Sequence, residues 1–227
     1  MSEGERKIEV KAMNWIVRCV ILAMSFYGLT VMAIEEPEFD TLSRNDSYEI
    51  RRYESYVVAE VDVAGDFKTA GNRAFQVLAG YIFGDNAPNE KMAMTAPVES
   101  RRHSGGEKMK MTAPVQSSPS AQLSDGFTYS FVMESKYTMD TLPEPTDPEI
   151  RLREIPGRVV AVRRYSGGWS QEKYQKEEAV LLEALAVDDI VPVGEPVFAR
   201  YNPPFMPWFM RRNEIIVELP DRQYGMK

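Results

Sequence analysis

YVVAEVDV, from Tyr56 to Val63, and RVVAVRRY, from Arg158 to Tyr165, share the letters VVA at a spacing of 102 residues. Valine and tyrosine favour β-strands, and each stretch follows a charged, alternating one, YEIRRYE from Tyr48 or IRLREIP from Ile150. A match that recurs in the same setting at a fixed spacing indicates an internal repeat. The sequence therefore predicts a unit that occurs twice and begins with two strands.

A glycine-aromatic corner follows each second strand, Gly65-Asp66-Phe67 in one copy and Gly167-Gly168-Trp169 in the other. The spacing of apolar residues after the first corner predicts a helix over 67–81. After the second corner, Ser170 is a good N-cap for a helix that runs to about Leu185. The face of the first helix that should be buried holds Phe67, Ala70, Ala74, Leu78 and Tyr81.

Strand-like stretches also follow both helices, and they complete an α+β unit of strand, strand, helix, strand, strand. The first repeat covers about 46–140 and the second about 148–220. Two such halves bury most apolar area by joining their sheets about a pseudo-twofold axis. The expected fold is a curved sheet or open barrel with a helix on each half.

The phrase KMAMTAPV at 91–98 returns as KMKMTAPV at 108–115, and Gly105-Gly106 lies between the copies. We interpret the two copies as the paired arms of a hairpin, each ended by its proline. The methionines, which alternate along the arms, suit the packing of a core; a soft thioether site for copper is the alternative. They are Met92, Met94, Met109 and Met111.

Composition limits the possible functions of this 227-residue chain. Apolar residues at 44% and charged residues at 27% are typical of a globular domain. A formal net charge of −7 repels a phosphate backbone, so nucleic acid is not expected as a partner.

The run from Trp15 to Ile34 is apolar except for Arg18. Its length fits a membrane span, and the basic leader with Val31-x-Ala33 at its end also fits a cleaved signal peptide. Residues 1–33 are therefore a signal peptide or an N-terminal anchor, with membrane attachment possible through 15–34. Residues 34–227 form the folded domain, which we expect to be exported (periplasmic or extracellular) or anchored outside the cytoplasm.

One loop, RYNPPFMPWFMRRN at 200–213, holds large apolar residues between prolines. Such a stiff segment either plugs a core or forms one wall of an apolar pocket. Arg211 and Arg212 at its end are expected to tie the loop to the sheet.

Together, YEIRRYE, KMxMTAPV, the GGW corner and YNPPFMPWFMRRNEIIVEL resemble the SOUL haem-binding protein family, over about Phe39 to Leu219. The resemblance implies a distorted eight-stranded barrel of two βαβ-type repeats flanked by two helices. It also implies a monomeric, non-enzymatic protein that binds haem or a related tetrapyrrole non-covalently, for transport, buffering or scavenging.

The resemblance places the ligand over the first helix, beside the proline-rich loop. Some members carry a histidine within the YEIR phrase, where this chain has Arg52, so that axial ligand is absent. Arg73 matches an arginine that contacts a propionate, and two propionate-binding lysines correspond to Gly80 and Met206. The residues expected to bind the tetrapyrrole are thus Arg73, Val77, Gly80, Tyr81, Met206 and Trp208.

Several of these assignments have alternatives. Arg73 could instead be solvated or pair with Asp62 or Asp66. Met206 and His103 are the candidates for an iron ligand, although His103, the only histidine, lies at the predicted hairpin tip, where a surface role is the default. The cleft could also hold no cofactor.

An enzyme is the second hypothesis, and it has little support in the sequence. With one histidine and one cysteine, no catalytic triad or zinc-ligand spacing can be assembled. Glu60 and Glu134 are the candidate acid and base of a small-molecule hydrolase. A third hypothesis is a protein-binding scaffold that uses the PPFMPWFM loop as an exposed apolar patch.

Overall fold

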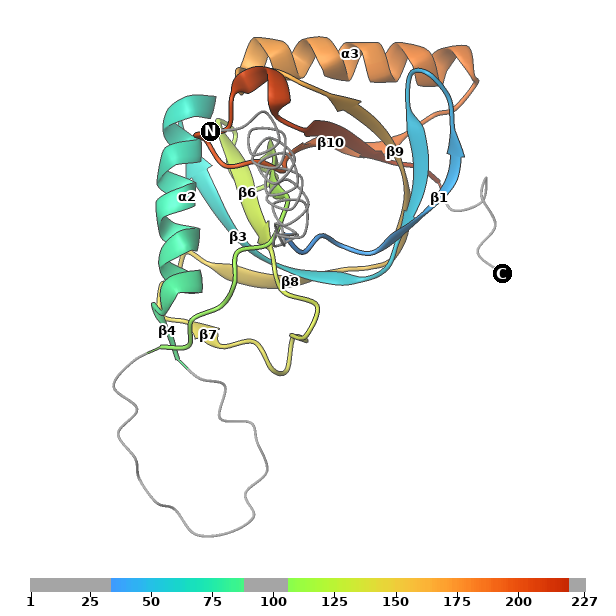
Figure 1. The fold of residues 1–227 in the computed structure, drawn as a ribbon. Helices are drawn as coiled ribbons and strands as arrows, with labels where there is room; N and C mark the ends of the chain where they lie inside the picture. The colour runs from blue at the N-terminus through green and yellow to red at the C-terminus, as the bar shows by residue number, and fades with distance from the viewer. Residues whose placement is uncertain (1–33, 88–105, 221–227) are drawn as a thin grey trace, which may run out of the picture. The chain divides into compact units, whose positions relative to one another are not determined.

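The computed structural model describes residues 34–87 and 106–220, which form two helices and an antiparallel sheet of nine strands (Figure 1). The helices are α2 (Phe67–Phe83) and α3 (Gln171–Val187), and a short 3-10 turn, η1, covers Trp208–Met210. The strands of the large sheet are β1 (Phe39–Arg44), β2 (Glu49–Tyr53), β3 (Tyr56–Ala64), β5 (Val115–Pro119), β6 (Gly126–Val132), β8 (Arg151–Ile155), β9 (Arg158–Tyr165), β10 (Val193–Arg200) and β11 (Asn213–Glu218). Two-residue strands β4 (Asn86–Ala87) and β7 (Glu144–Pro145) form a separate pair.

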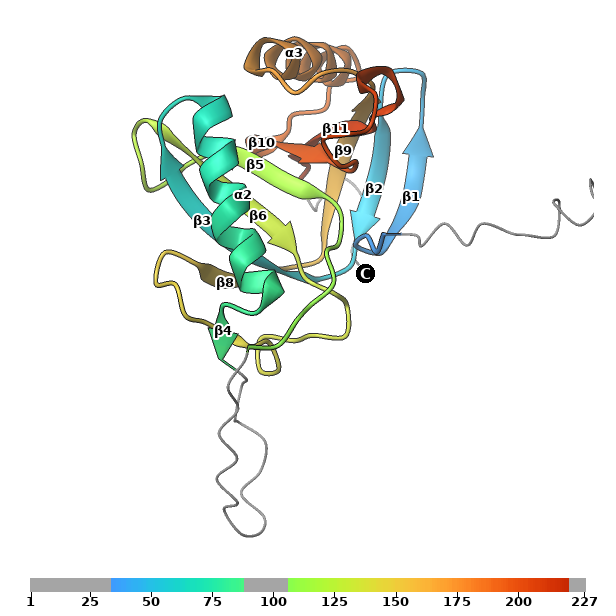
Figure 2. The same ribbon diagram turned by 60° about the vertical axis from the view of Figure 1, so that its left-hand side comes forward.

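The strand order confirms the predicted duplication. The order is β1-β2-β9-β11-β10-β5-β6-β3-β8. The counterparts in the two repeats are β2 and β8, β3 and β9, β5 and β10, and β6 and β11. Exchanging each strand for its counterpart gives the same order from β2 to β8, read backwards. The pseudo-twofold axis therefore passes between β5 and β10. The predicted α+β fold is confirmed, as a curled sheet with one helix on each half (Figure 2).

Two features of the sheet were not predicted. The first strand of each repeat pairs with the second strand of the other repeat, β2 with β9 and β8 with β3, so the halves exchange strands. In addition, β1 extends the sheet by pairing with β2 at its edge.

Both helices begin where the sequence predicts, and α2 also buries the predicted face. Asp66 accepts hydrogen bonds from the backbone N–H groups of Lys68 and Thr69, and Ser170 accepts one from Lys173. The predicted α2 face is buried against β3 and β6, and α3 packs against β9 and β11 through Tyr174, Leu181 and Leu185. At the end of α2, Gly84 has a φ of 124°, a conformation that favours glycine.

The prediction of a strand at 108–115 is wrong. Residues 106–114 form no strand, and β5 begins at Val115, after the proline that was expected to end it. Backbone groups here bond to different elements: Met109 N donates to the carbonyl of Ile82 (2.9 Å) and Ala113 N to that of Glu35 (2.8 Å). Met109 is buried in the core as expected, whereas Met111 is partly exposed. The first copy of the phrase, with Met92 and Met94, lies outside the described residues.

Membrane attachment through residues 15–34 is not addressed by the described part of the chain, which begins at Ile34. Neither α2 nor α3, the helices within 34–87 and 106–220, combines the length and apolar character of a membrane span.

Candidate functional site

The candidate site is a cleft of about 910 Å³ beside the N-terminal half of α2. One wall is α2 itself, the floor comes from β5 and β6, and the opposite wall comes from the loop after β10. Ligand pockets for small molecules have volumes of roughly 300–1,000 Å³ and are mostly apolar, which matches this cleft. Its aromatic lining consists of Phe67, Phe75, Tyr129, Phe131, Trp169, Tyr201 and Phe205.

The proline-rich loop forms a wall of this cleft through Pro203, Pro204 and Phe205. Of the two predicted roles for the loop, the wall is confirmed and the core plug is wrong, because Phe205 is 84% exposed. The expected tie between loop and sheet is made by Arg212, which pairs with Glu214 in β11 (3.0 Å). The hydrogen bonds of Arg211 stay within the loop: its Nε donates to the carbonyl of Met206 (2.8 Å), and its guanidinium also donates to that of Pro204 (2.7 Å).

Three cations and no carboxylate are among the described residues that line the cleft. The cations are Lys68, Arg200 and Arg211, in a chain whose net charge is −7. The described lining residues therefore carry a net positive charge, opposite in sign to that of the whole chain. The cleft is therefore suited to an anionic, largely apolar ligand.

Arg200 is the most distinctive of these cations. Its guanidinium lies over the rings of Phe198 (4.9 Å), Phe67 (5.0 Å) and Trp169 (5.3 Å), and within residues 34–87 and 106–220 it forms no ion pair. Arg200 is half-buried, and this burial lowers the pKa of its guanidinium from the ordinary value. Arginine stays charged in proteins, so this half-buried cation can pair with an anion that enters the cleft.

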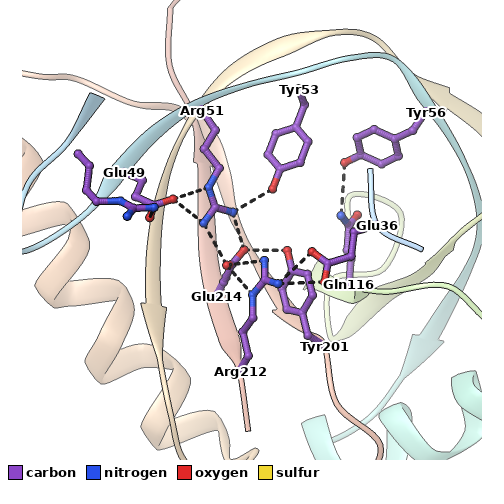
Figure 3. A network of polar contacts seen from close by, with 10 residues as sticks. Glu36, Glu49, Arg51, Tyr53, Tyr56, Gln116, Tyr201, Arg212 and Glu214 are labelled. Carbon is purple, nitrogen blue, oxygen red and sulfur yellow. Dashed lines mark hydrogen bonds and ion pairs between the residues drawn. The ribbon is translucent and has the colours of Figure 1, made fainter. Parts of the chain in front are cut away.

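A buried polar network, drawn in Figure 3, adjoins the cleft through Tyr201. Tyr201 lines the cleft and donates its hydroxyl to Glu214 (2.7 Å), which is fully buried. Arg51 (2.9 Å) and Arg212 (3.0 Å) also pair with Glu214. Burial alone would raise the pKa of Glu214, but the hydrogen bonds and charges of these arginines outweigh it and lower the pKa. The network thus fixes Tyr201 and the base of the proline-rich loop.

Few groups in the cleft could act as a ligand to iron. Tyr129 donates to the carbonyl of Phe67 (2.8 Å), and burial raises the pKa of Tyr129 to about 12, so its phenol stays protonated at neutral pH. Met111 supplies a thioether. The described residues contain no group of three His, Cys, Asp or Glu side chains that could hold a metal ion, and His103 lies outside them.

The residues that the resemblance places at the site on α2 lie away from this cleft. At about 100° per residue, positions 73, 77, 80 and 81 lie on the opposite side of the helix from Lys68, Asn72 and Phe75. Tyr81 is buried and donates to the carbonyl of Pro143 (2.7 Å). Val77 packs partly buried against the core, and Gly80 lies beside Asp85.

Arg73 is exposed and pairs with Glu149 at 3.2 Å, so the predicted pairing with Asp62 or Asp66 is wrong. The other two predicted residues, Met206 and Trp208, lie in the proline-rich loop outside the cleft lining, Met206 half-buried and Trp208 exposed. Met206 and Trp208 thus share one loop, and the structure does not gather them with the four predicted residues on α2 into one site.

Sequence reasoning missed Arg200, Tyr201 and Trp169 as site residues. A signal for each was available: Arg200 and Tyr201 begin the RYNPP phrase, and Trp169 ends the glycine-aromatic corner. In the structure Trp169 Nε1 donates to Asn213 Oδ1 (2.8 Å), and Arg211 lies over its ring at 4.2 Å.

Comparisons with known proteins agree with this architecture. Residues 34–218 match the family model described as SOUL heme-binding protein. The chain is 30% identical to heme-binding protein 2 of Mus musculus over 205 residues, which covers 84% of this chain and 93% of that protein. It is 28% identical to heme-binding protein 2 of Homo sapiens, over 80% of this chain and 88% of that protein.

Two solved structures share the fold at low sequence identity. The EcmrR C-terminal domain has a TM-score of 0.54 and 8% identity, and covers 76% of this chain and 98% of its own. A hydrolase from Listeria innocua has a TM-score of 0.50 and 10% identity, and the match covers 79% of this chain and 94% of that protein. At such identities the likeness concerns the fold alone.

Proposed function

Because the chain belongs to the SOUL heme-binding protein family, we propose that it binds haem or another acidic tetrapyrrole non-covalently in the cleft between α2 and the proline-rich loop. The observation that carries the proposal is the combination of aromatic walls with three cations and no lining carboxylate. A tetrapyrrole offers the complementary features, a flat apolar ring and acid groups at one edge.

Each part of the ligand has a partner in the cleft. Phe67, Phe75 and Phe131 provide apolar surface for the ring. Arg200 and Arg211 provide guanidinium groups, which match a carboxylate with two parallel donors. Haem iron would find at most the thioether of Met111 among the described lining residues, so we expect iron-free porphyrin to bind about as well as haemin.

The surroundings of the two candidate catalytic carboxylates, Glu60 and Glu134, favour binding over catalysis. Glu60 is held by Arg151 (3.3 Å) and Arg153 (2.8 Å), and Glu134 accepts a hydrogen bond from the backbone N–H of Lys110 (2.9 Å). Neither lines the cleft. A role in transport, buffering or scavenging follows from reversible binding, by a monomer that is exported or anchored through residues 15–34.

The test is a titration of the protein with haemin, with protoporphyrin and with protoporphyrin dimethyl ester, followed by the Soret band. Arg200→Met should weaken protoporphyrin binding by roughly 30-fold or more, because a desolvated charge pair is worth about 2–5 kcal/mol. The ester lacks the acid groups, so it should bind the wild type and Arg200→Met equally.

Arg73→Met is the matched control, since it removes an arginine from the other side of α2. If Arg73→Met weakens binding while Arg200→Met does not, the ligand occupies the face that the resemblance indicates and the cleft assignment is wrong. If neither haemin nor protoporphyrin changes its spectrum, the proposed function itself is wrong.

A further inference from the structure

The loop between β10 and β11 carries an exposed apolar patch that borders the cleft and shares Phe205 with its lining. Phe205, Trp208, Phe209 and Met210 are between 61% and 84% exposed, and together they form what we call the loop patch. Single exposed apolar residues are common on proteins, but four large ones within six positions are not. Such a surface indicates an interaction site.

The loop patch is held in shape by its own backbone. Met206 N donates to the carbonyl of Pro203 (3.0 Å) and Met210 N to that of Pro207 (2.9 Å), which forms the η1 turn. Arg211 clamps two more carbonyls from inside the loop. The rings of Trp208 and Phe209 pack edge to face at 5.7 Å, so each touches the other instead of the core. The exposure is therefore a property of an ordered loop.

Charge and composition indicate what the loop patch contacts. The segment from Arg200 to Asn213 contains three arginines and no acidic residue, although the whole chain has a net charge of −7. Arg212 pairs with Glu36 and Glu214, whereas Arg200 and Arg211 form no ion pair within residues 34–87 and 106–220. Tryptophan and phenylalanine beside arginine suit the headgroup region of a bilayer with anionic lipids. Protein interfaces are enriched in the same residues, so composition alone does not decide between the two.

The position of Ile34 favours a bilayer. Ile34 is the last residue of the apolar run that begins at Trp15, and it lines the same cleft as Phe205. The segment best suited to a membrane thus joins the domain at the cleft that the loop patch borders.

We propose that the loop patch inserts into the interface of a phospholipid bilayer containing anionic lipids, with the cleft opening toward the membrane. An apolar ligand could then pass between bilayer and cleft without crossing water. The proposal concerns the partner of the loop and does not depend on which ligand the cleft binds.

Site-specific fluorescence in the full-length chain tests this orientation. Cys19, the only cysteine, is replaced by serine, and the polarity-sensitive dye NBD is attached at Phe209→Cys, or at Met210→Cys as a second position. Val187→Cys, at the exposed end of α3, is the matched control. Circular dichroism checks that each variant is folded.

With vesicles of phosphatidylcholine and phosphatidylglycerol, the loop labels should shift to the blue and be quenched by nitroxide lipids, while the α3 label should not respond. Equal responses at the loop and α3 positions would overturn the proposal, as would loop labels that remain in water. A blue shift that depends on protein concentration without lipid would identify a protein-binding surface and also overturn it.

Discussion

Replacing Arg51 with methionine should destabilise the protein strongly, because it leaves Glu214 as a buried charge with too few partners. Arg51 is 3% exposed, and its guanidinium lies 2.9 Å and 3.2 Å from the two carboxylate oxygens of Glu214. It also pairs with Glu49 (2.7 Å) and donates to the hydroxyl of Tyr53 (3.2 Å). Methionine fills a similar volume without any donor.

The magnitude follows from what remains around Glu214. Removing one partner of a buried ion pair costs about 3–5 kcal/mol. Arg212 (3.0 Å) and Tyr201 (2.7 Å) still contact the carboxylate, so we expect the lower end, about 3 kcal/mol. In a domain of this size each kcal/mol lowers Tm by roughly 2–4 °C, which gives a decrease of about 6–12 °C.

The stability lost in Arg51→Met should also depend on pH. The lowered pKa of Glu214 means that its ionised form stabilises the wild type above the ordinary glutamate range, and that this stabilisation is lost as pH falls through the folded-state pKa. Without Arg51, burial favours the protonated carboxyl, which relieves part of the penalty in the variant. The stability difference between wild type and variant should therefore be largest near neutral pH and shrink toward acid pH.

Urea and thermal unfolding, measured at neutral and at acid pH, provide the assay. Arg73→Met is a suitable control because Arg73 and its partner Glu149 are both exposed, and such pairs contribute about 0–1 kcal/mol. Arg51→Met/Glu214→Leu should regain part of the lost stability, since it removes both charges. Wild-type stability of Arg51→Met at neutral pH, or a loss that stays constant with pH, would refute the reasoning.

Three further predictions concern the two helices. Ser170→Ala removes the N-cap of α3 and should lower the free energy of unfolding in urea by about 1 kcal/mol, whereas Ser170→Asp should keep it. Leu181→Ala opens a cavity under α3, where the side chain is fully buried, and should cost about 2–5 kcal/mol in the same assay; a smaller loss would mean that the helix can close onto the sheet. Tyr81→Phe leaves the carbonyl of Pro143 without its donor and should cost about 1–3 kcal/mol without changing protoporphyrin affinity; a change in affinity would favour the α2 face away from the cleft.

The helices and most strands could be predicted because their signals are local. The N-cap residues Asp66 and Ser170, and the apolar spacing from Phe67 to Tyr81, report on neighbours within a few positions. The exchange of β2 and β8 between the halves has no such signal, because strand pairing is decided by residues about a hundred positions away. The failed strand at 108–115 has the same cause: its backbone partners belong to distant elements, which sequence alternation does not reveal.

The candidate site, too, was predictable only where its signals are local. Periodicity identifies the buried face of α2, but it cannot tell which of the other faces borders a cavity. That depends on β5, β6 and the loop at 200–211, which approach the face carrying Lys68 and Phe75. The resemblance supplied positions on α2 and in the loop, but it could not show that Arg73 pairs with Glu149 on the outside of the protein.

Average charge and local charge lead to different conclusions about the partner of this protein. A net charge of −7 repels at long range a polyanion that would spread over the whole surface, such as nucleic acid. A small anion that enters the cleft meets the half-buried Arg200, where water screens the charge less than at the open surface, and its apolar part covers Phe67 and Phe75. The cleft should therefore prefer ligands that carry both an acid group and a large apolar surface. A simple carboxylate such as acetate should not compete with protoporphyrin for it.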